Sequence, residues 1–292
     1  MSSISIAALV ILYNYDSSCI DNIKSYADEV EVVYAFDNTE PSKKNEENQN
    51  KLMEIEGLVY IDGMGNQGLS FAINKIARLC LGKGIDWLIT FDQDSRIQSN
   101  MLNVMRQFIK ESNNIEDIGI ISPIIKEREL KYSQPAYEYS YLDWVIQSGA
   151  LHNLKAYFEI NGYDDNIFIY QLDTDYCFRL RDKGYKIVRL NYAVLNHNVS
   201  DEKVIVKYIH GQKVYINKFS PMSYYYILRN NMYCLNKYKD SNRVFCADLK
   251  RNTKTLLMTW CLDNHKLSKA RAIILAMVDY WFGNMGKSRH RF

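Results

Sequence analysis

Two carboxylates separated by one residue are the most informative chemical feature of this sequence. Asp92 and Asp94 directly follow the apolar run 87–91, which predicts a buried strand. Two oxygen donors with this spacing can turn toward one hard cation, and Mg²⁺ typically binds one or two carboxylates together with substrate phosphates. The pair therefore indicates a Mg²⁺ or Mn²⁺ site facing a diphosphate. A turn or a helix cap is the structural alternative for Asp-x-Asp-Ser.

A second pair of carboxylates lies at the start of a predicted helix over 174–183. Capping would account for only one of Asp173 and Asp175. The other could serve as the general base that a hydroxyl nucleophile needs. His197 ends a short apolar run and is a candidate metal or phosphate ligand, with a purely structural role as the alternative.

Small residues gather at 65–74, where a strand is expected to turn into a helix. Gly68 would allow the backbone to approach a phosphate or a ribose closely. The segment matches neither G-x-G-x-x-G nor a Walker loop, so an ordinary helix-opening turn is the alternative.

The elements that must position these residues alternate along the first half of the chain. Strands are predicted at 4–13, 30–36, 58–61, 87–91 and 118–122, with helices near 17–26, 42–55, 69–81 and 99–111. This alternation predicts an α/β fold with a mostly parallel sheet, in which ligands bind at the carboxyl ends of the strands. Four polar residues follow predicted strands and should line a single cleft: Asn14, Asp37, Asp62 and Asp92.

Length and composition fit one large α/β domain with a helical extension. The chain has 292 residues, of which 47% are hydrophobic, and we expect an α/β domain at 1–220 and a helical region at 221–292. The connection at 127–141 and the run 198–203 read as loops. A net charge of +2 with interspersed signs argues against a nucleic-acid-binding protein. Six cysteines without a C-x-x-C pair indicate reduced thiols in the cytoplasm, and no apolar run is long enough to span a bilayer.

The last predicted helix has an apolar face followed by a basic tail. The apolar positions are Ala270, Ile273, Ile274, Met277, Tyr280 and Trp281, and the basic ones are Lys287, Arg289, His290 and Arg291. This pattern suits peripheral contact with an anionic membrane. Packing on the catalytic domain, or on a second subunit in a homodimer, is the alternative.

The order of these motifs resembles family 2 glycosyltransferases, and most of all the bacterial rhamnosyltransferases of surface polysaccharides. The resemblance covers roughly residues 4–235. It rests on Tyr13-Asn14, Asp37-Asn38, Asn66-x-Gly68 with Ala72 and Asn74, TFDQDS at 90–95, residues 120–123, 148–150 and 162–164, DTDYCFRLRDKGY at 173–185, His197 and residues 226–230.

The resemblance implies a GT-A fold that binds a nucleotide-sugar and transfers the sugar with inversion. Asp173 would be the general base and Asp175 its rival, although Leu172 stands where many members have a glutamate. Asp92 and Asp94 would position the divalent ion, with Asp94 the more direct ligand. Nucleotide-sugar contacts are expected from Tyr13, Asn14, Asp37, Asn66, Gly68 and Asp92, with His197 and Arg229 on the diphosphate side.

The implied reaction is transfer of L-rhamnose from dTDP-L-rhamnose to a cell-surface polysaccharide, such as a capsule, or to its lipid-linked precursor at the cytoplasmic face of the membrane. A UDP-hexose transferase with the same fold, using glucose or galactose, is the nearest alternative. A nucleotidyltransferase should have a Gly- and Arg-rich phosphate loop near its N-terminus, unlike residues 13–16. A non-catalytic sugar- or metal-binding module of EF-hand type would need more oxygen ligands than residues 92–103 supply.

Overall fold

The computed structural model describes residues 4–126, 138–197, 204–209, 212–217, 219–262 and 266–292. The predicted loop 198–203 and most of 127–141 lie outside these ranges. The chain forms two compact units. Unit 1 comprises Met1–Asp164 and Asp173–Asn198, and unit 2 comprises Asp165–Leu172 and Val199–Phe292.

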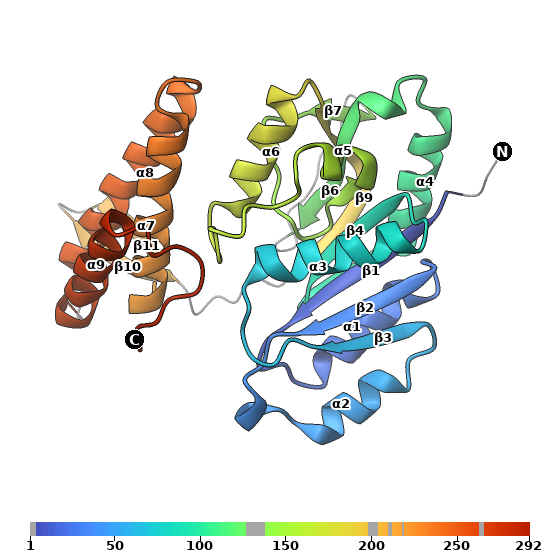
Figure 1. Cartoon of the computed structure of the whole chain (residues 1–292), viewed down its shortest axis with the longest axis horizontal. Coiled ribbons are helices and arrows are strands. Elements are labelled where there is room, and N and C mark those ends of the chain that lie inside the picture. The colour runs from blue at the N-terminus through green and yellow to red at the C-terminus, as the bar shows by residue number, and fades with distance from the viewer. Residues whose placement is uncertain (1–3, 127–137, 198–203, 210–211, 218, 263–265) are drawn as a thin grey trace. The chain divides into compact units, whose positions relative to one another are not determined.

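Unit 1 is built on a mixed sheet whose first half is parallel (Figure 1). All seven residues of β1 are buried, as expected for a strand covered on both faces. Strands β3 (Leu58–Asp62), β2 (Val32–Asp37), β1 (Ile6–Leu12) and β4 (Trp87–Asp92) lie side by side in that order. The sheet continues through β8 (Leu151–Asn153), β6 (Ile118–Lys126), β9 (Lys186–His197) and β5 (Ser95–Ile97), with β7 (Tyr139–Tyr141) on β9.

Strand register brings three acidic residues to one edge of the parallel half. Asp37 lies opposite Leu12 on one side and Asp62 on the other, and Asp92 pairs with Ile11. The prediction that these strand ends share an edge is therefore confirmed.

Helices cover both faces of this sheet. The main core joins the sheet to α1 (Ser18–Ala27) and α4 (Met101–Glu111), where Leu102, Met105 and Ile109 recur at helical spacing and are buried. In Figure 1, α3 lies in front of the strands. The bounds of the remaining helices are Glu46–Met53 for α2, Leu69–Gly82 for α3, Leu154–Glu159 for α5 and Leu172–Asp182 for α6, with short 3₁₀ turns at Pro41–Lys43 and Ile115–Asp117.

Unit 2 contains three long helices and a β-hairpin. The helices are α7 (Pro221–Tyr238), α8 (Arg243–Leu262) and α9 (Lys266–Trp281), and β10 (Val204–Ile209) pairs with β11 (Gln212–Asn217). Ser220 caps α7 by accepting the Ser223 N–H, and Pro221 occupies the first turn, where no backbone donor is needed. Among the described helices, none is long and apolar enough to cross a lipid bilayer.

Candidate active site

The Asp92 and Asp94 carboxylates lie at a turn between two strands. β4 ends at Asp92, residues 93 and 94 form the turn, and β5 begins at Ser95. Ser148 holds both sides of this turn, because its hydroxyl accepts the Asp92 N–H at 3.2 Å and bonds the Ser95 hydroxyl at 2.7 Å. The turn and the metal-donor interpretations are therefore compatible, because the turn places both partly buried carboxylates at the strand end.

Gln147 connects the first pair of carboxylates to the second. Its side-chain Nε2 donates to Asp92 Oδ1 at 2.6 Å, and its backbone N–H donates to the Asp173 carboxyl. The Thr90 hydroxyl donates to the Gln147 carbonyl and so fixes this segment on β4. The sequence reasoning missed Gln147, although its position just before residues 148–150 of the family motif offered a signal. Asp92 and Asp173 are thus both hydrogen bonded to Gln147, Asp92 through its side chain and Asp173 through its backbone N–H.

The Asp173 carboxyl has the environment of a base. Its Oδ1 is shielded from solvent and has no hydrogen-bond partner within the part of the chain that the structure describes. The pKa of Asp173 is raised to about 7, first by burial and then by the negative charge of Asp92, against a smaller lowering by the Gln147 N–H. A carboxyl with a pKa near neutrality can accept a proton under physiological conditions.

Asp175 has different surroundings, although it lies only two residues away. It is fully buried and forms an ion pair with Arg179 Nε at 2.8 Å, one helical turn along α6. Arg179 also donates to the Ile160 carbonyl at 2.8 Å. The ion pair attaches α6 to the end of α5, a structural task that favours Asp173 over Asp175 as the base.

Asp37 is buried at the end of β2 and is already hydrogen bonded. Its Oδ2 accepts the Tyr60 hydroxyl at 2.6 Å, and its Oδ1 accepts the Thr39 N–H at 2.8 Å. Burial, and then the hydrogen bond to Asp37, raise the pKa of Tyr60. Asn14 lies close by with a positive φ of 46°, and its N–H donates to the Thr39 hydroxyl at 2.8 Å. Tyr13 is 40% exposed beside it.

The glycine-containing loop is joined to the same strand end. Asn66 Oδ1 accepts the Gly68 N–H at 3.0 Å, and the Gly68 carbonyl accepts Asn38 Nδ2 at 3.3 Å. Gly68 has a φ of 89° and precedes α3, so a side chain here would be strained. The structure therefore places Asn66 and Gly68 next to the end of β2, where their predicted nucleotide contacts remain predictions.

The two predicted diphosphate contacts, His197 and Arg229, have different surroundings, and their predicted roles remain predictions. The backbone of His197 pairs with Ser95, but its side chain lies outside the described part of the chain. Arg229 belongs to unit 2, where it is buried and donates to the Tyr225 hydroxyl at 2.8 Å and to the carbonyls of Asn284 at 3.0 Å and Gly286 at 2.6 Å. These bonds give Arg229 a structural role in holding the C-terminal segment.

The donor set at the β4 end suits a hard divalent cation. No cluster of three or more His, Cys, Asp or Glu side chains able to hold a metal occurs among the described residues. Mg²⁺ does not require one, because substrate phosphates and water usually complete the coordination of one or two carboxylates. Asp92 and Asp94 therefore fit an ion that binds together with a diphosphate.

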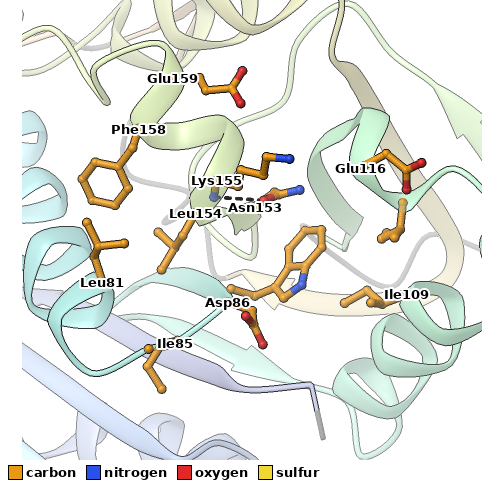
Figure 2. Close-up of a pocket in the computed structure, with 13 residues that line it drawn as sticks. Leu81, Ile85, Asp86, Ile109, Glu116, Asn153, Leu154, Lys155, Phe158 and Glu159 are labelled. Atoms are coloured by element: carbon orange, nitrogen blue, oxygen red, sulfur yellow. Dashed lines mark hydrogen bonds between the residues drawn. The ribbon is translucent and has the colours of Figure 1, made fainter. Parts of the chain in front are cut away.

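A groove lies at the other end of the same strand. It has a volume of about 770 Å³ and is lined by Trp87, which begins β4, together with residues such as Ile109, Leu154 and Phe158 (Figure 2). Because this groove adjoins the amino end of β4, it is separate from the carboxylates at the carboxyl end.

We expect Gln147→Leu to lower kcat/KM about tenfold while the protein stays folded, because a hydrogen bond to a charged group contributes about 1.5–3 kcal/mol. The substitution removes the donor to Asp92 and keeps the backbone N–H that bonds Asp173. Steady-state kinetics against metal concentration would measure the change. Gln147→Glu should shift the pH profile upward through added negative charge, whereas Gln107→Leu, on the exposed face of α4, should leave both readouts unchanged. Equal effects of Gln147→Leu and Gln107→Leu would contradict the positioning role.

Comparison with known proteins gives consistent results. The family model described as Glycosyl transferase family 2 matches residues 10–178. The dTDP-rhamnosyl transferase RfbF of Shigella flexneri is 26% identical over 313 residues, covering 98% of each chain.

Two solved structures are similar in fold at low sequence identity. GalNAc-T7, solved with UDP, GalNAc and Mn²⁺, matches with a TM-score of 0.57 and 11% identity, over 86% of this chain and 54% of that one. This chain thus spans about half the length of GalNAc-T7. S. aureus TarS 1-349 in complex with UDP-GlcNAc matches with a TM-score of 0.54 and 13% identity, over 94% of this chain and 80% of that one.

The expected GT-A fold is confirmed by these likenesses. Since the family model covers more than half of the chain, this protein belongs to glycosyl transferase family 2 and is a glycosyltransferase.

Proposed function

We propose that this enzyme transfers L-rhamnose from dTDP-L-rhamnose, with inversion, to a cell-surface polysaccharide or to its lipid-linked precursor. The observation that carries the reaction type is the Asp92–Gln147–Asp173 arrangement, which joins a metal-binding carboxylate to a base with a pKa near 7. The sugar assignment is supported by the likeness to a dTDP-rhamnosyl transferase along the whole chain. A lipid-linked acceptor would keep the enzyme at the cytoplasmic face of the membrane.

In the proposed mechanism Asp173 Oδ1 accepts the proton of the acceptor hydroxyl as its oxygen attacks the anomeric carbon. The bond from that carbon to the diphosphate oxygen breaks in the same displacement, so the configuration inverts and no covalent enzyme intermediate forms. A Mg²⁺ or Mn²⁺ ion held by Asp94 and Asp92 would neutralise the departing diphosphate. The two hydrogen bonds of Gln147 hold the Asp92 and Asp173 carboxylates in fixed positions relative to each other during the reaction.

Asp37 supports the nucleotide end of this proposal. Its two oxygens already accept bonds from Tyr60 and Thr39, so the carboxylate is fixed in place at the β2 end. A carboxylate retains further acceptor capacity after two such bonds, enough for a base N–H. Tyr13 is exposed close to Asn14 and can contact the same nucleoside.

Thermal stabilisation by nucleotides tests this proposal, because a ligand that binds only the native state raises its apparent stability. The protein is melted with dTDP, UDP or GDP, each with and without Mg²⁺ or Mn²⁺. We expect the largest shift with dTDP, and only when the metal is present. A preference for UDP would assign a UDP-hexose donor, and the absence of any shift would contradict nucleotide-sugar binding.

A further inference from the structure

Helix α9 has most of its large apolar residues on the outside, although Ile273 and Leu275 pack partly buried against the core of unit 2. Its buried positions are small or polar, namely Lys269, Ala272, Ala276 and Asp279. Its exposed positions include Leu267, which is 88% exposed, and Trp281 and the adjoining Phe282, which are 77% and 78% exposed. The complete exposed apolar set is Leu267, Ile274, Met277, Val278, Trp281 and Phe282. These residues fall on one arc of the helix, which we call the outer face of α9.

The inward orientation of the polar side is fixed by specific bonds. Asp279 Oδ2 accepts the Tyr225 hydroxyl at 2.6 Å and lies 2.9 Å from His290 Nε2, and Asp279 Oδ1 accepts Asn284 Nδ2 at 3.1 Å. On the same side, Lys269 Nζ stands over the Tyr224 ring at 4.9 Å from its centre. Helix α9 therefore cannot rotate its apolar arc inward without breaking this network.

The C-terminal segment after α9 is held in place as well. Arg229 bonds the carbonyls of Asn284 and Gly286, and the Ser288 N–H donates to the Tyr226 hydroxyl at 2.9 Å. The basic side chains of this segment are therefore attached to the same helical unit as the outer face.

The exposed charged side chains of residues 266–292 are all positive. The only acidic residue in 266–292 is Asp279, which is buried. The exposed cations are Lys266, Arg271, Lys287, Arg289 and Arg291. Residues 221–292 contain thirteen Lys and Arg but only four Asp and Glu, a net charge of +9, whereas residues 1–220 contain twenty-three and thirty, a net charge of −7. The positive charge is thus concentrated in the C-terminal helices.

We propose that the outer face of α9, with these cations, is a docking surface for an anionic phospholipid membrane. An apolar arc ending in two aromatic residues and flanked by Lys and Arg is the pattern that binds at the interface of anionic bilayers. A second copy of the chain fits less well, because two such faces would bring like charges together with no exposed carboxylate from 266–292 between them. The surface does not depend on which nucleotide-sugar the enzyme uses.

Co-flotation of the full-length protein with vesicles tests this surface. The protein is mixed with vesicles of phosphatidylcholine alone or of phosphatidylcholine with phosphatidylglycerol. We expect binding to the phosphatidylglycerol vesicles that weakens as salt increases, since salt screens exposed charges. Equal binding to both kinds of vesicle, or binding to neither, would overturn the proposal.

Matched variants separate the apolar contribution from the electrostatic one. Trp281→Gln with Phe282→Gln should reduce vesicle binding about tenfold or more, because both side chains would lose apolar contact with the bilayer. Val244→Gln with Met258→Gln, at exposed positions of α8, is the control and should change little. Arg271→Gln, Arg289→Gln and Arg291→Gln together should weaken binding to anionic vesicles, by about fivefold for each charge. Replacing Lys110, Lys155 and Lys183 of unit 1 by Gln removes the same charge and should not weaken vesicle binding.

Sedimentation velocity distinguishes the second-copy alternative. Circular dichroism first shows that each variant is folded. Membrane docking would be overturned, and the outer face assigned to self-association, by three results together. The wild-type protein would form a dimer, the Trp281/Phe282 variant would be monomeric, and the wild-type protein would not bind vesicles. A wild-type protein whose oligomeric state is the same as that of the variant, combined with the flotation result above, would support membrane docking.

Discussion

Asp173→Asn should reduce sugar transfer by about 10²–10⁴-fold while leaving donor affinity nearly unchanged, since general-base catalysis contributes an effect of that size. The amide keeps the shape of the side chain and can still interact with Gln147, but it cannot accept the proton of the acceptor hydroxyl. The measurement is kcat for transfer together with the dissociation constant for the nucleotide.

Asp175→Asn is the control for this prediction. Its carboxylate forms the buried ion pair with Arg179. Its substitution should therefore lower the melting temperature of the protein, while the transfer rate of the folded variant changes little. Full turnover in Asp173→Asn with turnover lost in a folded Asp175→Asn protein would move the base to Asp175.

Asp173→Asn should also stabilise the folded protein above neutral pH. The folded-state pKa of Asp173 is raised to about 7, above the ordinary value near 3.9, so the wild-type folded state binds the proton more tightly than the unfolded state. Wild-type stability from this group is therefore fully present below about pH 4 and is lost as the pH rises to about 7. Asparagine avoids that loss.

At pH 8 we expect Asp173→Asn to be more stable by about 1–2 kcal/mol, or roughly 2–8 °C in melting temperature, after allowance for solvent screening. The difference should shrink as the pH falls from 7 toward 4. A melting-temperature difference that does not vary with pH would show that the Asp173 pKa is not raised.

Asp94→Ala should remove most of the metal-dependent part of nucleotide binding, weakening it by about 100-fold, the upper end of what loss of a supporting group at a metal site costs. The effect should vanish when binding is measured without metal, because the remaining contacts lie on the nucleoside side. Isothermal titration with and without Mn²⁺ gives both values.

Asp86→Ala is a matched control for Asp94→Ala. Asp86 directly precedes β4, bonds Ser5 and is exposed, so it tests removal of a carboxylate at the opposite end of the same strand. It should leave nucleotide binding unchanged. A metal-dependent affinity that survives in Asp94→Ala would place the ion elsewhere.

The parallel half of the sheet could be predicted because its strands are long, apolar and separated by amphipathic helices. β1 and β4 carry this pattern in residues 6–12 and 87–92, and their polar ends follow from the chain direction alone. The common edge of Asp37, Asp62 and Asp92 follows from the same alternation.

The antiparallel pairings of the short strands β8, β5 and β7 were not predictable in the same way. β8 has three residues and pairs with β4 and β6, which are far from it in sequence. Three residues are too few to show a two-residue alternation. The role of Gln147 depends on this pairing, because its bonds to Asp92 and Asp173 join segments 55 and 26 positions away. The hairpin β10–β11 was also not predicted, and its strand 212–217 shows no strict two-residue alternation, because Val214, Tyr215 and Ile216 are consecutive.

The orientation of α9 shows a further limit of sequence patterns. The apolar recurrence predicts an amphipathic helix, but it cannot say which face packs inward. That depends on the bonds of Asp279 to Tyr225 and Asn284, which only the folded unit contains.

Donor turnover followed by proton NMR tests the central claim most directly. The wild-type enzyme is given dTDP-L-rhamnose, UDP-glucose or UDP-galactose with Mg²⁺ and no glycan acceptor, so that water takes the sugar, and the anomeric signal of the released free sugar is recorded before mutarotation. We predict that dTDP-L-rhamnose is consumed fastest and that the product has the opposite anomeric configuration to the donor. Faster consumption of a UDP-hexose would contradict the sugar assignment, and retention of configuration would contradict the single displacement with Asp173 as base.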